Sequence, residues 1–158
     1  VLFASRKQLN AVYEGVPLSL RSLILAQGEL PKHDILRQHR ERLDAGKGSV
    51  IFGLASFAEG VDLPGKYCSH VVIAKIPFAV PEDPVEEALA EWISANNGNP
   101  FMEITVPDAA VRLIQASGRL LRSESDRGKI SILDRRIVTR QYGRKMLDSM
   151  PPYQQVIE

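Results

Sequence analysis

Short apolar segments alternate along this chain with longer segments whose apolar residues recur at helical spacing. The short segments are rich in β-branched residues and continuously apolar, as strands are when both faces of their sheet are covered. We therefore predict strands over residues 1–5, 22–26, 49–54, 71–76 and 129–133.

The longer segments predict helices, because apolar residues return every three or four positions and capping or breaking residues stand at their ends. The predicted helices are residues 7–14, 34–43, 84–95, 108–122 and 137–150. We expect Gly46 to end the second of these, Pro84 to lie near the start of the third and Asp108 to cap the fourth.

This alternation of strands and helices predicts an α/β fold, with a mostly parallel central sheet and helices on both faces. Ligands of such sheets bind at the loops that follow the carboxyl ends of the strands. The length of 158 residues suits one domain. We expect that domain to span residues 1–152, followed by a tail over residues 153–158.

The net charge of +1 gives no indication of a nucleic-acid partner for the chain as a whole. The charge is uneven, however, because residues 119–145 hold many more basic than acidic side chains. This basic stretch is either a solvated face or a surface for phosphates, and composition leaves both interpretations open.

Cys68 is the only cysteine, which excludes a disulfide framework and a cysteine-ligated metal or iron–sulfur site within this chain. No apolar stretch approaches the roughly 20 residues that span a bilayer, and the first residues lack the layout of a signal peptide. We therefore expect a cytoplasmic protein without a membrane partner. Val1 lies inside an apolar run with no methionine before it, so we also expect a piece of a longer protein.

A glycine-rich segment, residues 53–65, directly follows the third predicted strand, where a ligand loop is expected. Glu59 and Asp62 stand on either side of Gly60, and their carboxylates can accept hydrogen bonds from a ribose hydroxyl or an arginine. An ordinary turn with solvated acids explains the pattern equally well.

The helix predicted over residues 108–122 carries a polar face that ends in two arginines. Gln115, Arg119 and Arg122 fall within about 60° of one another on a helical projection. Gly118 costs helix stability, which indicates a purpose such as the close approach of a ligand. Two guanidinium groups one turn apart suit a polyphosphate, although a solvated polar stripe is the alternative.

Two further strand ends carry polar residues. Ser5 and Arg6 follow the first strand, where a hydroxyl and first-turn amides can hold a phosphate, although N-capping by Ser5 is the stronger interpretation. Lys75 lies at the end of the fourth strand and can contact a nucleic-acid backbone or simply end the strand. The sequence contains no Walker A motif, so we do not expect this chain alone to hydrolyse ATP.

Three segments, in this order, resemble motifs of the second motor domain of superfamily 2 helicases. The strand of residues 1–5 resembles motif IV. Residues 56–62, which include Ser56, Glu59, Gly60 and Asp62, resemble motif V in the form of the XPD-like branch. The Q-x-x-G-R-x-x-R pattern of motif VI is matched by Gln115, Gly118, Arg119 and Arg122. Local sequences such as Tyr142-Gly143 are similar to those of bacterial DinG-type helicases.

The resemblance implies the second RecA-like domain, of the P-loop-NTPase type, in a DinG-type ATP-dependent DNA helicase. ATP with Mg²⁺ would lie in a cleft shared with the protein's own N-terminal RecA-like domain. Arg119 and Arg122 would reach the phosphates, one of them as the arginine finger, with Gln115 in support. Gly118 and the motif V residues Glu59, Gly60 and Asp62 would belong to the nucleotide site and couple it to DNA.

The same resemblance implies 5′-to-3′ unwinding of single-stranded or branched DNA in DNA repair. Ser5, Arg6, Ser56 and Lys75 are the expected DNA contacts. A [4Fe–4S] cluster, where the family has one, lies in the first domain, and this chain has no ligands for it. Two other hypotheses stay open: a phosphate- or nucleotide-binding module without motor activity, and a structural domain whose polar helix is merely solvated.

Overall fold

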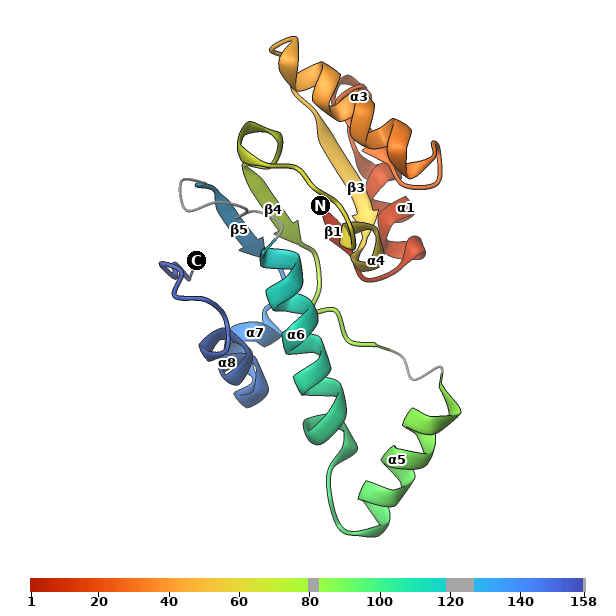
Figure 1. The fold of residues 1–158 in the computed structure, drawn as a ribbon, viewed down its shortest axis with the longest axis vertical. Coiled ribbons are helices and arrows are strands. Elements are labelled where there is room, and N and C mark those ends of the chain that lie inside the picture. Colours follow the sequence, from red (N-terminus) through yellow and green to blue (C-terminus); the bar gives the residue numbers. More distant parts are fainter. Residues whose placement is uncertain (80–82, 119–126, 158) are drawn as a thin grey trace. The chain divides into compact units, whose positions relative to one another are not determined.

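The computed structural model describes residues 1–79, 83–118 and 127–157. Five strands form one sheet in the order β2-β3-β1-β4-β5, and every neighbouring pair is parallel. The strands are β1 (Leu2–Phe3), β2 (Ile24–Ala26), β3 (Val50–Leu54), β4 (His70–Ile73) and β5 (Lys129–Ile132). Each of the five overlaps a segment predicted as a strand, and the predicted parallel α/β sheet is confirmed (Figure 1).

Each predicted helix overlaps at least one helix of the described residues, and several short helices were not predicted. They are α1 (Arg6–Gly15), α2 (Leu18–Arg21), α3 (Lys32–Asp44), α4 (Ala55–Ala58), α5 (Pro84–Ala95), α6 (Val106–Ser117), α7 (Arg136–Thr139) and α8 (Gln141–Asp148). A 3₁₀ turn, η1 (Gly65–Tyr67), and a π-helical turn, η2 (Phe101–Thr105), complete the set. Within these described ranges, no helix has both the length and the apolar character that crossing a membrane requires.

The chain divides into two compact units. The first comprises Val1–Lys75 and Ala116–Asp134 and contains the whole sheet. The second comprises Ile76–Gln115 and Arg135–Glu158 and holds α5, η2, most of α6, α7 and α8.

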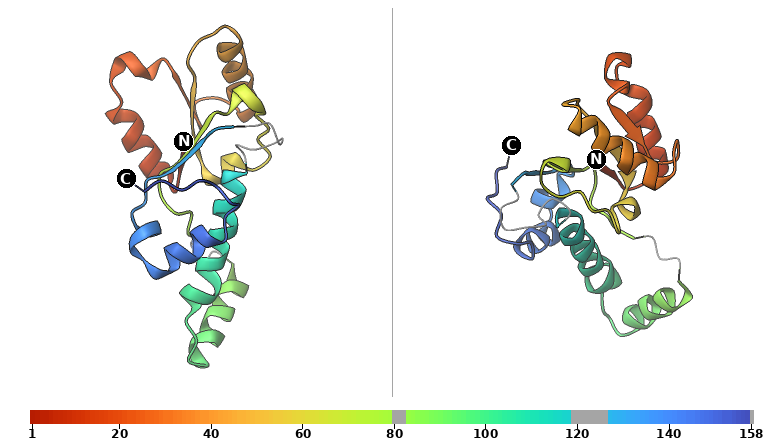
Figure 2. Two further views of the ribbon diagram at one scale, coloured as in Figure 1. Left: turned by 90° about the vertical axis from the view of Figure 1, so that its left-hand side faces the viewer. Right: turned by 45° about the horizontal axis from the view of Figure 1, so that its top comes forward.

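Side chains of the first unit alternate between two apolar clusters, one on each face of the sheet. Leu25 and Ile51 pack into the cluster formed with α3 and α4, whereas Ala26 and Phe52 pack into the cluster formed with α1. The left view of Figure 2 accordingly shows α1 and α3 on opposite sides of the strands. Both faces are covered, which explains why the strand sequences are continuously apolar.

Gly46 ends α3 as predicted. It has a φ of +70°, its amide donates to the carbonyl of Leu43 at 3.1 Å, and the amide of Lys47 donates to the carbonyl of Arg42 at 2.8 Å. This pair of bonds is a Schellman motif, in which a left-handed residue satisfies the last carbonyls of a helix.

Asp108 is not a cap, and that prediction is wrong. The helix begins two residues earlier, at Val106, whose backbone is already helical because the π-helical turn η2 leads directly into it. Asp108 instead lies in the first turn of α6, where its Oδ2 accepts from Nε of Arg112 at 2.8 Å.

The helix predicted over residues 137–150 is also wrong in part, because it is broken into α7 and α8. Arg140, with φ −108° and ψ 144°, is extended and separates the two. The start of the second predicted strand is likewise helical, since Ser22 ends α2. Short helices of this kind lack the length needed for a clear periodic pattern.

Three aromatic rings form a cluster in the second unit. The ring of Phe78 lies 5.4 Å from that of Phe101 and 5.8 Å from that of Tyr142, and the last two lie 5.3 Å apart. The guanidinium of Arg136 lies 5.3 Å from the centre of the Phe78 ring. Edge-to-face and cation–π contacts at such distances join α7, α8, η2 and the segment after β4.

Candidate functional site

The candidate residues of motifs IV and V and Lys75 follow three strands that neighbour one another. Ser5 and Arg6 follow β1, Ser56 lies in α4 directly after β3, and Lys75 follows β4. Leu2 of β1 is paired with both neighbouring strands, and all three strands are parallel. Their carboxyl ends therefore meet at one edge of the sheet, the edge at which ligands of such sheets bind.

Ser5 and Arg6 both have partners within the chain. The hydroxyl of Ser5 accepts from the amide of Gln8 at 3.2 Å and caps α1, as the alternative interpretation expected. Arg6 donates to the carbonyl of Gln27. Its guanidinium lies beside Gly28, which has a φ of +106°. The contact of Ser5 and Arg6 with nucleic acid stays a prediction.

Gly53 is needed for packing at the end of β3. A Cβ atom added there would lie 2.9 Å from the ring of Phe57, so only glycine lets α4 fold back onto the strand. Gly60 and Gly65 have φ values of +68° and +56°, the left-handed region that favours glycine. The three glycines of this segment thus shape the loop.

Buried and exposed residues alternate from α4 into the loop that follows it. Phe57, Val61 and Leu63 are buried in the apolar cluster against α3. Glu59 and Asp62 are exposed. The apolar side chains therefore anchor the loop, and its two acidic residues stay exposed near the carboxyl edge of the sheet.

Two cations on α3 hold the main chain of this loop, and the sequence analysis did not identify them. Nζ of Lys32 donates to the carbonyl of Glu59. Nη2 of Arg40 donates to the carbonyl of Asp62 at 2.7 Å. Lys32 and Arg40 are eight residues apart, which is about two helical turns. This spacing places both side chains toward one side of the helix, and it is the only indication of their shared role that the sequence offered.

His39 fixes the end of the same loop from within the core, with 6% of its surface exposed. Its Nε2 lies 2.8 Å from the carbonyl oxygen of Tyr67 and its Nδ1 lies 2.8 Å from Oγ of Ser49. Because a carbonyl only accepts, Nε2 carries the proton, and in the neutral ring Nδ1 accepts from the serine hydroxyl. Burial lowers the pKa of His39 below its ordinary value of 6.5.

Acid should therefore destabilise this chain through His39. The unfolded chain takes up a proton near pH 6.5 whereas the folded chain resists it, so the free energy of unfolding should fall as the pH drops below 6.5 and level off below the folded pKa. Urea denaturation at several pH values measures this slope. His39→Gln should flatten it, while His33→Gln, at an exposed position, should keep it; equal slopes in wild type and His39→Gln would contradict the assignment.

The motif VI residues are only partly described. Gln115 is exposed on α6, whereas Leu113 and Ala109 on the opposite side of the helix are fully buried. This confirms a helix with one polar and one apolar face. Gly118 follows the end of α6, and Arg119 and Arg122 lie outside the described residues. The roles of these motif VI residues stay predictions.

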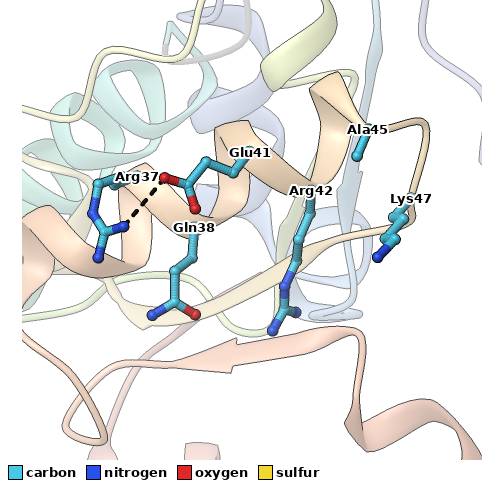
Figure 3. Close-up of a pocket in the computed structure, with 6 residues that line it drawn as sticks. All are labelled: Arg37, Gln38, Glu41, Arg42, Ala45 and Lys47. Carbon is cyan, nitrogen blue, oxygen red and sulfur yellow. Dashed lines mark hydrogen bonds and ion pairs between the residues drawn. The ribbon is translucent and has the colours of Figure 1, made fainter.

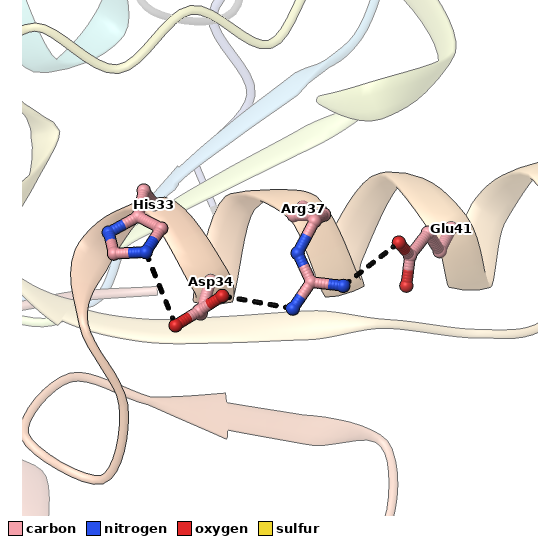
Figure 4. Close-up of polar contacts among 4 residues, drawn as sticks. All are labelled: His33, Asp34, Arg37 and Glu41. Atoms are coloured by element: carbon pink, nitrogen blue, oxygen red, sulfur yellow. Dashed lines mark hydrogen bonds and ion pairs between the residues drawn. The ribbon is translucent and has the colours of Figure 1, made fainter.

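The outer face of α3 carries a shallow hollow of about 450 Å³, shown in Figure 3. It is lined by Arg37, Gln38, Glu41, Arg42, Ala45 and Lys47. None of these is a predicted site residue, and Arg37 is already bonded to Asp34 at 2.9 Å and Glu41 at 3.1 Å (Figure 4). The Arg37 bond lowers the pKa of Asp34. This ladder of exposed ion pairs is a solvated face.

Among the residues that the structure describes, no three histidine, cysteine or acidic side chains gather closely enough to hold a metal ion. A four-cysteine cluster also does not fit this chain, because Cys68 is its only cysteine.

Comparisons with known proteins identify the family to which this chain belongs. A family model described as the helicase C-terminal domain matches residues 1–153. The ATP-dependent DNA helicase DinG of Photobacterium profundum is 49% identical over 161 residues, covering 100% of this chain and 23% of that protein. The ATP-dependent DNA helicase DinG of Escherichia coli (strain K12) is 40% identical over 153 residues, covering 97% of this chain and 21% of that protein.

A solved structure of an XPD helicase is similar in fold, with a TM-score of 0.68 and 25% sequence identity, over 93% of this chain and 26% of that one. This similarity confirms the predicted RecA-like α/β fold. The chain spans less than a quarter of the length of the curated relatives it matches.

Proposed function

Because this chain belongs to the helicase C-terminal domain family and is of the DinG type, we propose that it is the motor half of an ATP-dependent DNA helicase. In this proposal residues 1–152 are the second RecA-like domain and residues 153–158 are a tail. ATP with Mg²⁺ binds between this domain and an N-terminal RecA-like domain that supplies the Walker residues. The protein works in the cytoplasm.

The observation that carries the proposal is the placement of the motif V loop. Glu59 and Asp62 are exposed after β3, at the sheet edge where β1 and β4 also end, and their carbonyls are held by α3. Fixed acceptors at that edge suit a ribose hydroxyl or the arginines of motif VI.

Arg119 and Arg122 are proposed to donate to the phosphates, with one acting as the arginine finger. Bound ATP supplies the phosphoanhydride bond whose hydrolysis drives the motor. A planar guanidinium offers several fixed donors and stabilises the negative charge that develops on the phosphate oxygens. Gln115 positions this pair from the polar face of α6, and Gly118 leaves room for close approach.

Single-stranded or branched DNA is proposed to cross the carboxyl edge of the sheet, in a motor that moves 5′ to 3′ and serves DNA repair. Ser5, Arg6, Ser56 and Lys75 follow the three neighbouring strands that end at this edge. Their charges and hydroxyls suit a phosphate backbone, which dominates binding without sequence preference. A [4Fe–4S] cluster, where present, belongs to the N-terminal part of the full-length protein.

The second candidate is a phosphate- or nucleotide-binding module without motor activity, favoured by the same pair of arginines. A fluorescence titration separates the two with a labelled ATP analogue and the 158-residue chain. The module binds the analogue by itself, whereas a motor half lacks the other side of the cleft and binds it weakly. Saturation at micromolar analogue would favour the module.

The isolated chain is expected to show no ATP turnover, with or without single-stranded DNA, because it lacks a Walker lysine and a magnesium-binding acid. The full-length protein should hydrolyse ATP and displace a DNA strand. Steady-state phosphate release and a strand-displacement assay measure both. Turnover by the pure chain, or a full-length protein without DNA-dependent turnover, would contradict the proposal.

A further inference from the structure

We propose that Arg40 and Lys32, on α3, are positioning residues that set the motif V loop and thereby couple DNA binding to ATP hydrolysis. This inference rests on the proposed motor function and adds a second helix to its machinery. Neither residue lies in motif IV, V or VI. Both act through the main chain of the loop, without touching nucleotide or DNA themselves.

The two cations hold carbonyls on either side of Gly60. Lys32 donates to the carbonyl of Glu59 and Arg40 to that of Asp62. Gly60, with its φ of +68°, makes the turn between them. The carbonyls of Glu59 and Asp62 thus bond to α3 and the apolar residues of the loop are buried, while Glu59 and Asp62 are exposed residues.

Each cation is itself held over an aromatic ring of the segment that it fixes. Nζ of Lys32 lies 5.2 Å from the centre of the Phe57 ring, and the guanidinium carbon of Arg40 lies 5.9 Å from that of Tyr67. Cation–π attraction at these distances helps to orient the donors toward the carbonyls. Hydrogen bonds from a charged donor to a carbonyl are also stronger than those from a neutral donor.

The other end of the loop is tied to the same helix. The hydroxyl of Tyr67 donates to Oδ1 of Asp44 at 2.9 Å, and Nζ of Lys66 contacts the same oxygen at 2.5 Å. Nε2 of His39 donates to the carbonyl oxygen of Tyr67. Residues from the first turn of α3 to its last therefore contact the loop over residues 59–67, while Asp34, Arg37 and Glu41 of the same helix bond to one another in the ladder of Figure 4.

A movement of α3 would therefore act on the backbone of motif V through the side chains of Lys32 and Arg40. A motor couples its two ligands when a single element responds to both, and such coupling is altered by residues that contact neither ligand. Both Arg40 and Lys32 are exposed, so removing either should change the loop without opening the core.

The test uses the full-length protein with Arg40→Gln and Lys32→Met, and Arg37→Gln as a matched control on the outer face of α3. In both loop variants the DNA-stimulated kcat should fall about tenfold. The KM for ATP, the turnover without DNA and the Kd for single-stranded DNA should each stay within about twofold of wild type, since no ligand contact is removed. Arg40→Lys, which keeps a cation over Tyr67, should recover part of the lost rate.

Hydrogen exchange gives an independent readout of the loop itself. Peptides over residues 59–67 should exchange faster in Arg40→Gln and Lys32→Met than in wild type or Arg37→Gln, while the unfolding temperature of all variants stays close to wild type. Loop variants that keep the DNA-stimulated kcat of the control would overturn the inference. So would a lost rate accompanied by a lowered unfolding temperature in both loop variants.

Failure of the underlying function is distinguishable. If Arg122→Ala hydrolyses ATP normally, the proposed motor role is wrong, whatever the activity of the α3 variants. If Arg122→Ala is inactive and the loop variants behave like Arg37→Gln, only the role of α3 is wrong.

Discussion

Arg122→Ala in the full-length protein is expected to lower ATP turnover by a factor of about 10³ or more and to abolish strand displacement, because an arginine that stabilises phosphoryl-transfer charge is worth about 10³–10⁵ in rate. Arg122 closes the motif VI pattern that begins at Gln115 on the polar face of α6. Binding of single-stranded DNA should persist, since the expected DNA contacts follow β1, β3 and β4 and do not include Arg122. Phosphate release, strand displacement and fluorescence anisotropy measure the three properties.

Arg112→Ala is the matched control for this experiment. Arg112 is an exposed arginine on α6, and its Nε already donates to Asp108 at 2.8 Å. Its removal should leave turnover near wild type. Comparison of Arg119→Ala with Arg122→Ala then identifies the finger as the arginine whose loss lowers kcat further. Near-normal turnover in both variants would exclude motif VI from catalysis and favour the binding module.

Gly143→Ala is expected to destabilise the chain by about 3 kcal/mol or more, the upper end of the cost of overpacking. A Cβ atom on Gly143 would lie 2.3 Å from the carbonyl oxygen of Ile137 and 2.4 Å from that of Arg136. Both are backbone atoms of α7, so the clash cannot be relieved by rotating a side chain. α7 and α8 would have to separate, which would also disturb Tyr142 in the aromatic cluster.

Urea denaturation of the 158-residue chain measures this loss. Gly15→Ala is the control, because Gly15 ends α1 with no heavy atom within 4 Å of an added Cβ. That variant should be as stable as wild type or slightly more so, since alanine restricts the unfolded chain. A Gly143→Ala variant within about 0.5 kcal/mol of wild type would show that α7 and α8 separate at little cost.

Glycine positions by themselves carry only part of this information. In the sequence, Gly53, Gly60 and Gly143 look alike, as residues that allow unusual backbone or close approach. The structure separates them: Gly60 turns the backbone with a positive φ, Gly53 admits the ring of Phe57, and Gly143 admits the carbonyls of α7. The difference depends on which atoms lie nearby, and only the folded chain places those atoms.

The hydrophobic pattern determined the order of strands and helices, the parallel sheet and the position of motif V after a buried strand, because periodicity is a local property that the sequence carries directly. The hydrophobic pattern did not predict boundaries such as the start of α6 at Val106 and the break at Arg140, since these follow from packing between neighbouring turns. The motif patterns likewise indicated the helicase family from the sequence alone.

Only the tertiary structure decided how the candidate site is held. Arg40 and Asp62 are 22 residues apart, and Lys32 and Glu59 are 27 apart, so no local pattern joins them. These contacts exist because β2 and β3 pair in parallel and bring α3 beside the loop that leaves β3. The sequence determined which residues carry charge. The crossover from β2 through α3 to β3 determined which carbonyls accept hydrogen bonds from those residues.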